Sequence, residues 1–195
     1  STCGSNQWKT ASNWPVPETK ELVLYLDGSR EDAAASNGGL LTTDSPVHES
    51  SDSYLYNPED PAIHLIDMSE NELEVPADYA EEEKRSDVLC YTPECLTEDL
   101  TITGDATAEI FLSSDCEDTD LVVRITDVDE AGRSMKLADG VLCVRYRNQF
   151  DHPDFMEPGT VYPVKIRTTK VSHTFLKGHR LRVTITSSAE NFIFP

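Results

Sequence analysis

The residue pattern between Glu98 and Arg147 constrains the fold more than any other part of this chain. Small and apolar residues occupy every second position from Ala106 to Leu112 and again from Leu142 to Arg147, and glycine and aspartate residues separate such runs. Strict alternation of this kind is typical of strands that turn one face to a core and the other to water. The region therefore predicts a succession of half-buried strands in an all-β fold.

Further strands are expected on both sides of this region. In the last of them, residues 181, 183 and 185 are apolar and predicted to face inward, whereas Arg182, Thr184 and Thr186 are predicted to face outward. The expected strands are Leu22–Leu26, a short one at Leu40–Leu41, one around Tyr54 and Tyr56 that Pro58 and Pro61 end, Asp87–Thr92, Leu121–Val128, Thr160–Thr169 and Arg180–Ser187.

The segments between these strands predict long loops. Residues 27–53 are rich in Gly, Ser, Asp and Thr, and residues 63–86 lack a clear strand period, so both are expected to be loops. Within the second, the string from Asp78 to Arg85 predicts a short helix, because Asp78 is a good N-cap and acidic residues follow it in the first turn. The whole chain of 195 residues is expected to form one domain with at most one or two short helices.

Composition excludes several classes of partner. The chain carries 36 acidic and 16 basic residues, a net charge of -20, which argues strongly against nucleic acid. This charge indicates either plain solubility or an acidic face that meets a basic partner domain. No apolar run approaches the length of a membrane span and no signal-peptide pattern opens the sequence, so no membrane contact is expected. Five cysteines without a CxxC pair predict free thiols and a cytoplasmic protein.

Catalytic and metal-binding patterns are weak throughout the sequence. No GxSxG elbow is present, and the serine pairs at 50–51, 113–114 and 187–188 lie in strand ends or loops, so no catalytic residue is predicted. His173 and His179 flank a Gly178 turn and could face each other, but with no third ligand in view they are interpreted as hydrogen-bonding residues. The acidic run from Asp115 to Asp120 lacks EF-hand spacing. No cofactor and no metal are therefore expected.

The order of short motifs resembles a known family. These motifs are the turn at Ile102–Gly104, SSD at Ser113–Asp115, DTD at Asp118–Asp120, DG at Asp139–Gly140, RYR at Arg145–Arg147, YLYNPEDP at Tyr54–Pro61 and the segment His173–Val183, which resembles the family's closing hairpin. They are similar to the C-terminal, non-catalytic domain of the cocaine-esterase and X-prolyl dipeptidyl-peptidase (CocE/NonD) family of serine hydrolases. The resemblance implies a jelly-roll β-sandwich of the galactose-binding-like type, and an α/β-hydrolase domain of the same parent chain as partner.

The resemblance also assigns roles to particular segments. Residues 1–17 match the family's junction with the hydrolase domain, which implies that Trp8 and Trp14 are packing anchors between neighbouring parts. The family's loop corresponding to residues 63–75 runs beside the hydrolase cleft, which makes Ile66, Met68 and Leu73 candidates for a cleft wall, although a core-edge role fits them equally well. The family continues into one further strand beyond Pro195. An edge left without that strand, together with the junction surface, would favour self-association, so a homo-oligomer is a further expectation.

Two other functions remain open at this stage. The same sandwich architecture occurs in carbohydrate-binding modules, and a purely structural or oligomerisation module would need no site at all. Binding modules usually present exposed aromatic residues along a groove, whereas here most aromatics fall on predicted strands or in the junction segment. The sequence therefore favours an accessory domain of an ester or amide hydrolase of the dipeptidyl-peptidase type.

Overall fold

The regular structure of this chain consists almost entirely of β-strands, which confirms the predicted all-β class. The computed structural model describes residues 3–14, 16–17, 19–28, 38–48, 50–65 and 78–193. Within these ranges the helical elements are two single turns of 3-10 helix, η2 (Glu82–Lys84) and η3 (Val144–Tyr146). No helix in this part of the chain is long and apolar enough to cross a membrane.

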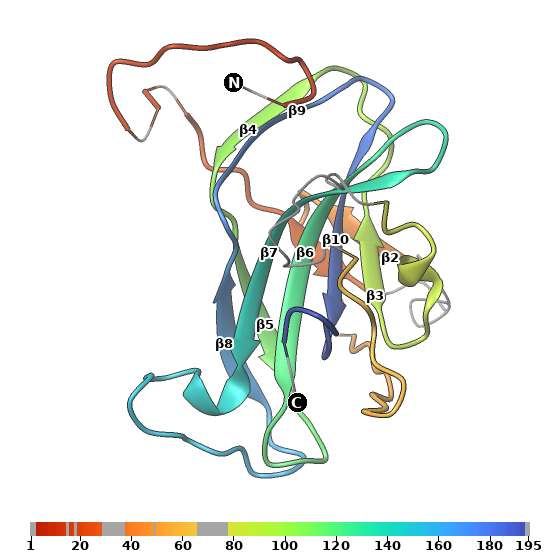
Figure 1. Cartoon of the computed structure of the whole chain (residues 1–195), viewed down its shortest axis with the longest axis vertical. Coiled ribbons are helices and arrows are strands. Elements are labelled where there is room, and N and C mark those ends of the chain that lie inside the picture. Colours follow the sequence, from red (N-terminus) through yellow and green to blue (C-terminus); the bar gives the residue numbers. More distant parts are fainter. Residues whose placement is uncertain are drawn as a thin grey trace.

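One layer of the fold is a six-stranded sheet with the order β1-β2-β3-β10-β6-β7 (Figure 1). Its neighbouring strands pair antiparallel except β2 and β3, which run parallel. The strands are β1 (Tyr25–Asp27), β2 (Gly39–Thr42), β3 (Leu89–Thr92), β6 (Asp120–Val128), β7 (Ser134–Cys143) and β10 (Arg180–Thr186).

The second layer is a long two-stranded ribbon. β4 (Leu100–Gly104) pairs with β9 (Val171–Phe175), and β5 (Thr107–Leu112) pairs with β8 (Tyr162–Arg167), both antiparallel. β5 follows β4 after two residues, so the two ladders continue each other along one side of the molecule (Figure 1). Gly104, with φ at +135°, ends β4 in a conformation that side chains rarely adopt, and the ribbon changes direction there.

The core lies between the two layers and follows the predicted alternation. Residues 106, 108, 110 and 112 pack on the core, whereas Glu109 and Phe111 face outward, as expected. The buried side chains of the core include Leu121, Val123, Val144, Val164, Ile166, Phe175, Leu181 and Ile185.

The outward side of β10 is buried, which corrects the sequence-based prediction. Thr184 and Thr186 are only 2% and 4% exposed. Irregular segments from residues 62–64, 79–88 and 187–189 cover this face of the sheet, and their buried members include Tyr79 and Glu83. Alternation in the sequence distinguishes the two faces of a strand, but it cannot show that a polar face is itself covered.

Two elements near the core differ from their predicted form. β7 ends at Cys143, and η3 replaces the strand expected to continue to Arg147. The cause is local: the amide of Val144 donates to the carbonyl oxygen of Thr119 at 2.9 Å, and that of Arg145 donates to Asp118 Oδ1 at 2.9 Å. β9 and β10 also do not form a hairpin, because β9 pairs with β4 while β10 pairs with β3 and β6.

Three shorter segments are also less regular than predicted. β1 begins at Tyr25, and the preceding Leu22 and Val23 are exposed and lie outside the strand. Tyr54 lies outside any strand, and its hydroxyl instead bonds Ser187 Oγ at 2.7 Å. The predicted helix from Asp78 is reduced to η2, although Asp78 Oδ1 accepts the amide of Ala80 as an N-cap would; the same oxygen also accepts the amide of Ser134. The short strand expected at Leu40–Leu41 is confirmed as part of β2.

Candidate functional site

The N-terminal segment is fixed to the edge of the ribbon. The amide of Cys3 donates to the carbonyl oxygen of Ser172 at 3.0 Å, and the amide of Thr174 donates to the carbonyl oxygen of Cys3 at 2.9 Å. These bonds place Cys3 parallel to β9 and opposite His173. The segment predicted to be a junction thus enters the fold as an additional edge of the sheet.

Gly4 makes this attachment sterically possible. Its φ is +82°, in the left-handed region, and a Cβ at this position would overlap the carbonyl oxygen of Thr174. Only glycine fits this backbone conformation and this close approach together. The turn at Gly4 then directs the chain away from β9 toward the two tryptophans.

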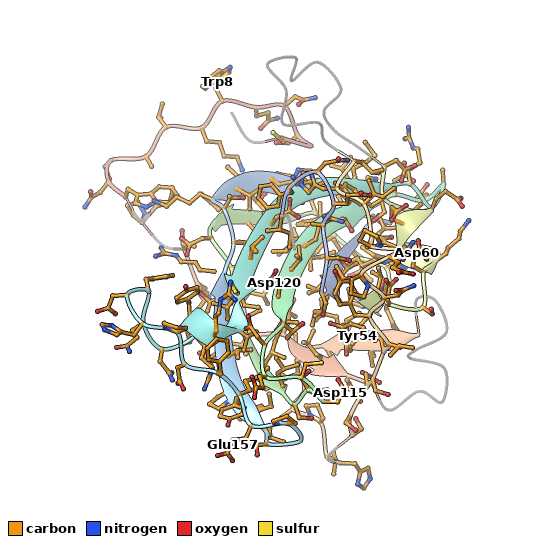
Figure 2. The ribbon with its side chains drawn as sticks, turned by 60° about the horizontal axis from the view of Figure 1, so that its bottom comes forward. Trp8, Tyr54, Asp60, Asp115, Asp120 and Glu157 are labelled. Carbon is orange, nitrogen blue, oxygen red and sulfur yellow. The ribbon has the colours of Figure 1, made fainter. Side chains whose placement is uncertain are left out.

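Both junction tryptophans lie at the surface. Trp8 is 86% exposed and projects from the N-terminal segment away from the strands (Figure 2), and Trp14 is 52% exposed. The ammonium group of Lys170 lies 5.6 Å from the centre of the Trp14 ring, within range of a cation–π contact. The two exposed indole rings form an apolar surface on a segment whose backbone is anchored to β9.

The candidates for a cleft wall, Ile66, Met68 and Leu73, lie outside the described residues. The positions that precede and follow them are well fixed. The amide of His64 donates to the carbonyl oxygen of Glu190 at 2.8 Å, and the amide of Leu65 donates to the hydroxyl of Tyr79 at 2.9 Å.

His64 belongs to a buried cluster of charged and polar side chains around Asp139. Arg124 Nε donates to Asp139 Oδ1 at 2.8 Å, and Lys136 Nζ donates to Asp139 Oδ2 at 2.5 Å. His64 Nε2 lies 3.2 Å from the same Oδ2, and the Arg124 guanidinium lies 3.7 Å above the centre of the Tyr79 ring. Burial alone would raise the pKa of Asp139, but the hydrogen bond from His64 and the charges of Arg124 and Lys136 outweigh it and hold the pKa well below its ordinary value.

A second buried carboxylate, Glu83, lies on the same face of the sheet. Ser134 Oγ donates to Glu83 Oε1 at 2.6 Å, and Arg182 forms an ion pair with the other carboxylate oxygen. Each oxygen of the two carboxylates therefore has a protein partner. They attach the covering segments to the sheet, which is a structural role.

The two turn histidines converge on one carboxylate. His173 Nε2 lies 2.8 Å from Asp127 Oδ2, and His179 Nδ1 lies 2.9 Å from Asp127 Oδ1. Each ring nitrogen that faces the carboxylate donates, because an ionised carboxylate only accepts. The interpretation as hydrogen-bonding residues is thus correct. Asp127, their shared acceptor, was not predicted. It lies two residues after Ile125 in the same strand, so the alternation places both side chains on the inward face and could have identified it.

Two of the remaining sequence candidates, Asp118 and Ser188, have structural partners. Asp118 forms an ion pair with Arg145 at 3.2 Å, and Ser188 Oγ accepts the amide of Ala62 at 2.8 Å. Within the described residues no group of three or more His, Cys, Asp or Glu side chains is arranged to hold a metal ion. All five cysteines are free, and burial, followed by the nearby Asp120, raises the pKa of Cys143 to about 11.

Comparisons with known proteins agree on one family. The model of a family described as the X-Pro dipeptidyl-peptidase C-terminal non-catalytic domain matches residues 2–195. The cocaine esterase of Rhodococcus sp. (strain MB1 Bresler) is 38% identical over 187 residues, which cover 95% of this chain and 33% of that protein.

Solved structures show the same architecture. An aminopeptidase from the marine sediment archaeon Thaumarchaeota archaeon matches with a TM-score of 0.82 and 27% identity, over 97% of this chain and 32% of that one. An α-amino acid ester hydrolase has the same fold, with a TM-score of 0.81 and 23% identity over 97% of this chain and 33% of that one. The present chain therefore spans about a third of the length of the relatives it matches.

Proposed function

Because this chain belongs to the family of X-Pro dipeptidyl-peptidase C-terminal non-catalytic domains, we propose that it is the accessory domain of a serine hydrolase acting on esters or amides, including X-prolyl peptides. The names of its relatives, an esterase, an aminopeptidase and an ester hydrolase, support this class of parent enzyme. The serine pair at 187–188 supports a non-catalytic role, because Ser187 bonds Tyr54 and Ser188 bonds Ala62 rather than a histidine.

The accessory domain attaches to the catalytic domain through the N-terminal segment. The observation that carries this proposal is the 86% exposure of Trp8 on a segment that Cys3 fixes to β9. A large aromatic side chain on a fixed backbone gains apolar contact at little cost in conformational entropy, which suits an interface between domains. Ile66, Met68 and Leu73 are proposed to contribute to the wall of the hydrolase cleft.

The activity test compares this chain with the longer parent polypeptide. The parent should hydrolyse p-nitrophenyl esters or X-prolyl p-nitroanilides and should be inactivated by a serine-directed reagent, whereas residues 1–195 alone should show no turnover above background. Turnover by residues 1–195 that survives repurification, or a parent without any hydrolase activity, would contradict the proposal.

The attachment test uses Trp8→Ala in both polypeptides. Phe150→Ala is a matched control, because Phe150 is also an exposed aromatic residue, at 89%. We expect Trp8→Ala to lower the melting temperature of the parent but not that of residues 1–195, and Phe150→Ala to change neither. Equal behaviour of the two variants in the parent would show that Trp8 is not an interface residue.

Two finer proposals accompany this function. The isolated chain is expected to self-associate through the uncovered apolar surface around Trp8 and Trp14, which sedimentation at micromolar concentration tests directly. A cytoplasmic location is proposed on the ground that the cysteines are free thiols. A clean monomer in sedimentation would contradict the proposed self-association. Recovery of the parent from an oxidising compartment would contradict the proposed cytoplasmic location.

A further inference from the structure

The cluster around Asp139, on the covered face of the six-stranded sheet, holds more positive than negative charge. Arg124 on β6 and Lys136 on β7 both pair with Asp139, and their side chains are only 7% and 17% exposed. His64, which also contacts Asp139, supplies no negative charge in either protonation state. One carboxylate therefore faces two cations, and one positive charge is left over in a largely dry environment.

The guanidinium group of Arg124 is only partly satisfied. Its Nε donates to Asp139 Oδ1 at 2.8 Å, whereas Asp139 Oδ2 contacts Lys136 Nζ at 2.5 Å and His64 Nε2 at 3.2 Å. Asp139 thus binds Arg124 through one oxygen only. Arg124 Nη2 is buried and has no hydrogen-bond partner among the described residues. The ring of Tyr79 lies 3.7 Å from the guanidinium carbon and contacts the group through the ring face, which is a cation–π contact.

A buried cationic donor without an acceptor indicates a bound group. Such a donor has lost its hydrogen bonds to water, and the loss is larger for a charged group than for a neutral one. Nearly all buried polar groups in folded proteins have a partner, which is a protein atom, a water molecule or an ion. A water molecule at Arg124 Nη2 would accept the hydrogen bond but would leave the excess charge. An anion would provide both the acceptor and the counter-charge.

We propose that the covered face of the sheet binds a chloride ion at Arg124 Nη2, on the edge of the guanidinium group opposite Nε. The two terminal nitrogens, Nη1 and Nη2, direct a fork of N–H bonds along that edge. A single negative charge there makes the cluster of Arg124, Lys136 and Asp139 neutral. The ion then helps to hold the covering segments on the sheet, because it neutralises the charge that they bury. This role does not depend on the proposed function of the parent enzyme.

Burial and charge favour chloride over larger anions. Buried residues from 62–64, 79–88 and 187–189 cover this face, so a bulky carboxylate or phosphate compound has no access to Arg124 Nη2. Sulfate carries two charges, whereas the cluster has one positive charge in excess. The chain as a whole has a net charge of -20, which repels anions from its surface. At the buried cations the attraction is stronger, because the protein interior screens charge less than water does.

Urea unfolding of residues 1–195 in mixtures of sodium chloride and sodium gluconate tests the proposal. The mixtures have the same ionic strength, so the screening of surface charges stays constant, and gluconate is too bulky for the buried edge. An ion that binds only the folded state raises the ratio of folded to unfolded protein in proportion to its concentration above Kd, so a tenfold increase in chloride should raise this ratio about tenfold. The same ratio in every mixture would overturn the proposal.

Crystals of residues 1–195 grown with sodium bromide locate the ion directly. Bromide has the same charge as chloride, is only slightly larger, and scatters X-rays anomalously near its absorption edge. We expect an anomalous peak in contact with Arg124 Nη2. Peaks confined to the protein surface, or an ordered water molecule at this nitrogen in its place, would contradict the proposal.

The substitution Arg124→Lys assigns the chloride effect to this site. It keeps the positive charge and removes the fork of N–H bonds. Arg182→Lys is the matched control, because the Arg182 side chain is also buried on this face, at 11% exposed, but bonds Thr92 and Glu83. The quantity compared is the chloride dependence of the folded-to-unfolded ratio, which a general loss of stability does not change.

We expect Arg124→Lys to abolish this dependence and Arg182→Lys to keep it. An equal dependence in the two variants would show that chloride acts elsewhere and would refute the assignment. If Arg124→Lys does not fold, the position of the bromide peak in the unsubstituted chain decides.

Discussion

Replacing Asp139 by asparagine should destabilise this domain more than the loss of any surface charge. Asparagine has nearly the same shape, so the substitution removes the negative charge with little change in packing. The side chains of Arg124 and Lys136, which both bond Asp139, are only 7% and 17% exposed. After the substitution these two cations remain in a largely dry environment without a counter-charge.

The size of the effect follows from this burial. Removing one partner of a buried ion pair costs about 3–5 kcal/mol, because the remaining charge stays desolvated. For a domain of this size, each kcal/mol lowers the melting temperature by about 2–4 °C, so a decrease of about 6–20 °C is expected. That is a large part of the total stability of about 5–15 kcal/mol that a folded domain usually has.

Urea and thermal unfolding of purified residues 1–195 measure this loss. Glu109→Gln is the matched control, because it also converts a paired carboxylate into an amide, but the Glu109 and Lys165 side chains are 70% and 66% exposed and such pairs contribute little. Adding Lys136→Met to Asp139→Asn should restore part of the stability, because it removes one of the uncompensated cations. A loss below about 1 kcal/mol for Asp139→Asn, the level of an average substitution, would refute this reasoning.

Three further predictions concern the junction, the acid stability and the core. Gly4→Ala should lower the free energy of unfolding by at least about 1–2 kcal/mol because of the left-handed backbone alone, and by more because of the overlap with Thr174. Gly132→Ala, at φ +87° with open space around it, is the control that isolates the effect of the overlap in thermal unfolding. Because the folded-state pKa of Asp139 lies below its unfolded value of about 3.9, its contribution is fully present above that pH and is lost as the pH falls through the folded pKa; urea unfolding between neutral pH and pH 2 should therefore depend less on pH in Asp139→Asn. Phe175→Ala should cost about 3–5 kcal/mol because Phe175 is fully buried, whereas Phe150→Ala at the exposed surface should change the unfolding midpoint little.

The alternation of residue types predicted most of the strands. It predicted which face of a strand packs on the core, but not whether the opposite face is covered. From Ala106 to Leu112 it identified both the strand and its inward face, because a polar position there does face water. On β10 the same logic was wrong for Thr184 and Thr186, because irregular segments with no period of their own cover that face. A pattern of period two carries information on the strand alone and none on what packs against it.

The buried charges were less accessible to sequence reasoning. Asp139, Arg124 and Lys136 come from two neighbouring strands and His64 from a distant loop, so no spacing in the sequence joins them. The convergence of His173 and His179 on Asp127 likewise depends on a contact between two sheets. By contrast, the junction role of residues 1–17 comes from the resemblance to a family and stays a prediction, and Trp8 and Trp14 are exposed.

The attachment of Cys3 to β9 has a consequence for the order of events during synthesis. Cys3 bonds Ser172 and Thr174, so this contact joins positions separated by nearly the entire length of the chain. A ribosome releases the N-terminal part first, and a contact of such separation forms only after the later strands have emerged. The segment that carries Trp8 therefore lacks its hydrogen bonds to β9 until β9 has been synthesised. Any part of the polypeptide synthesised before it must reach a stable fold without relying on this domain.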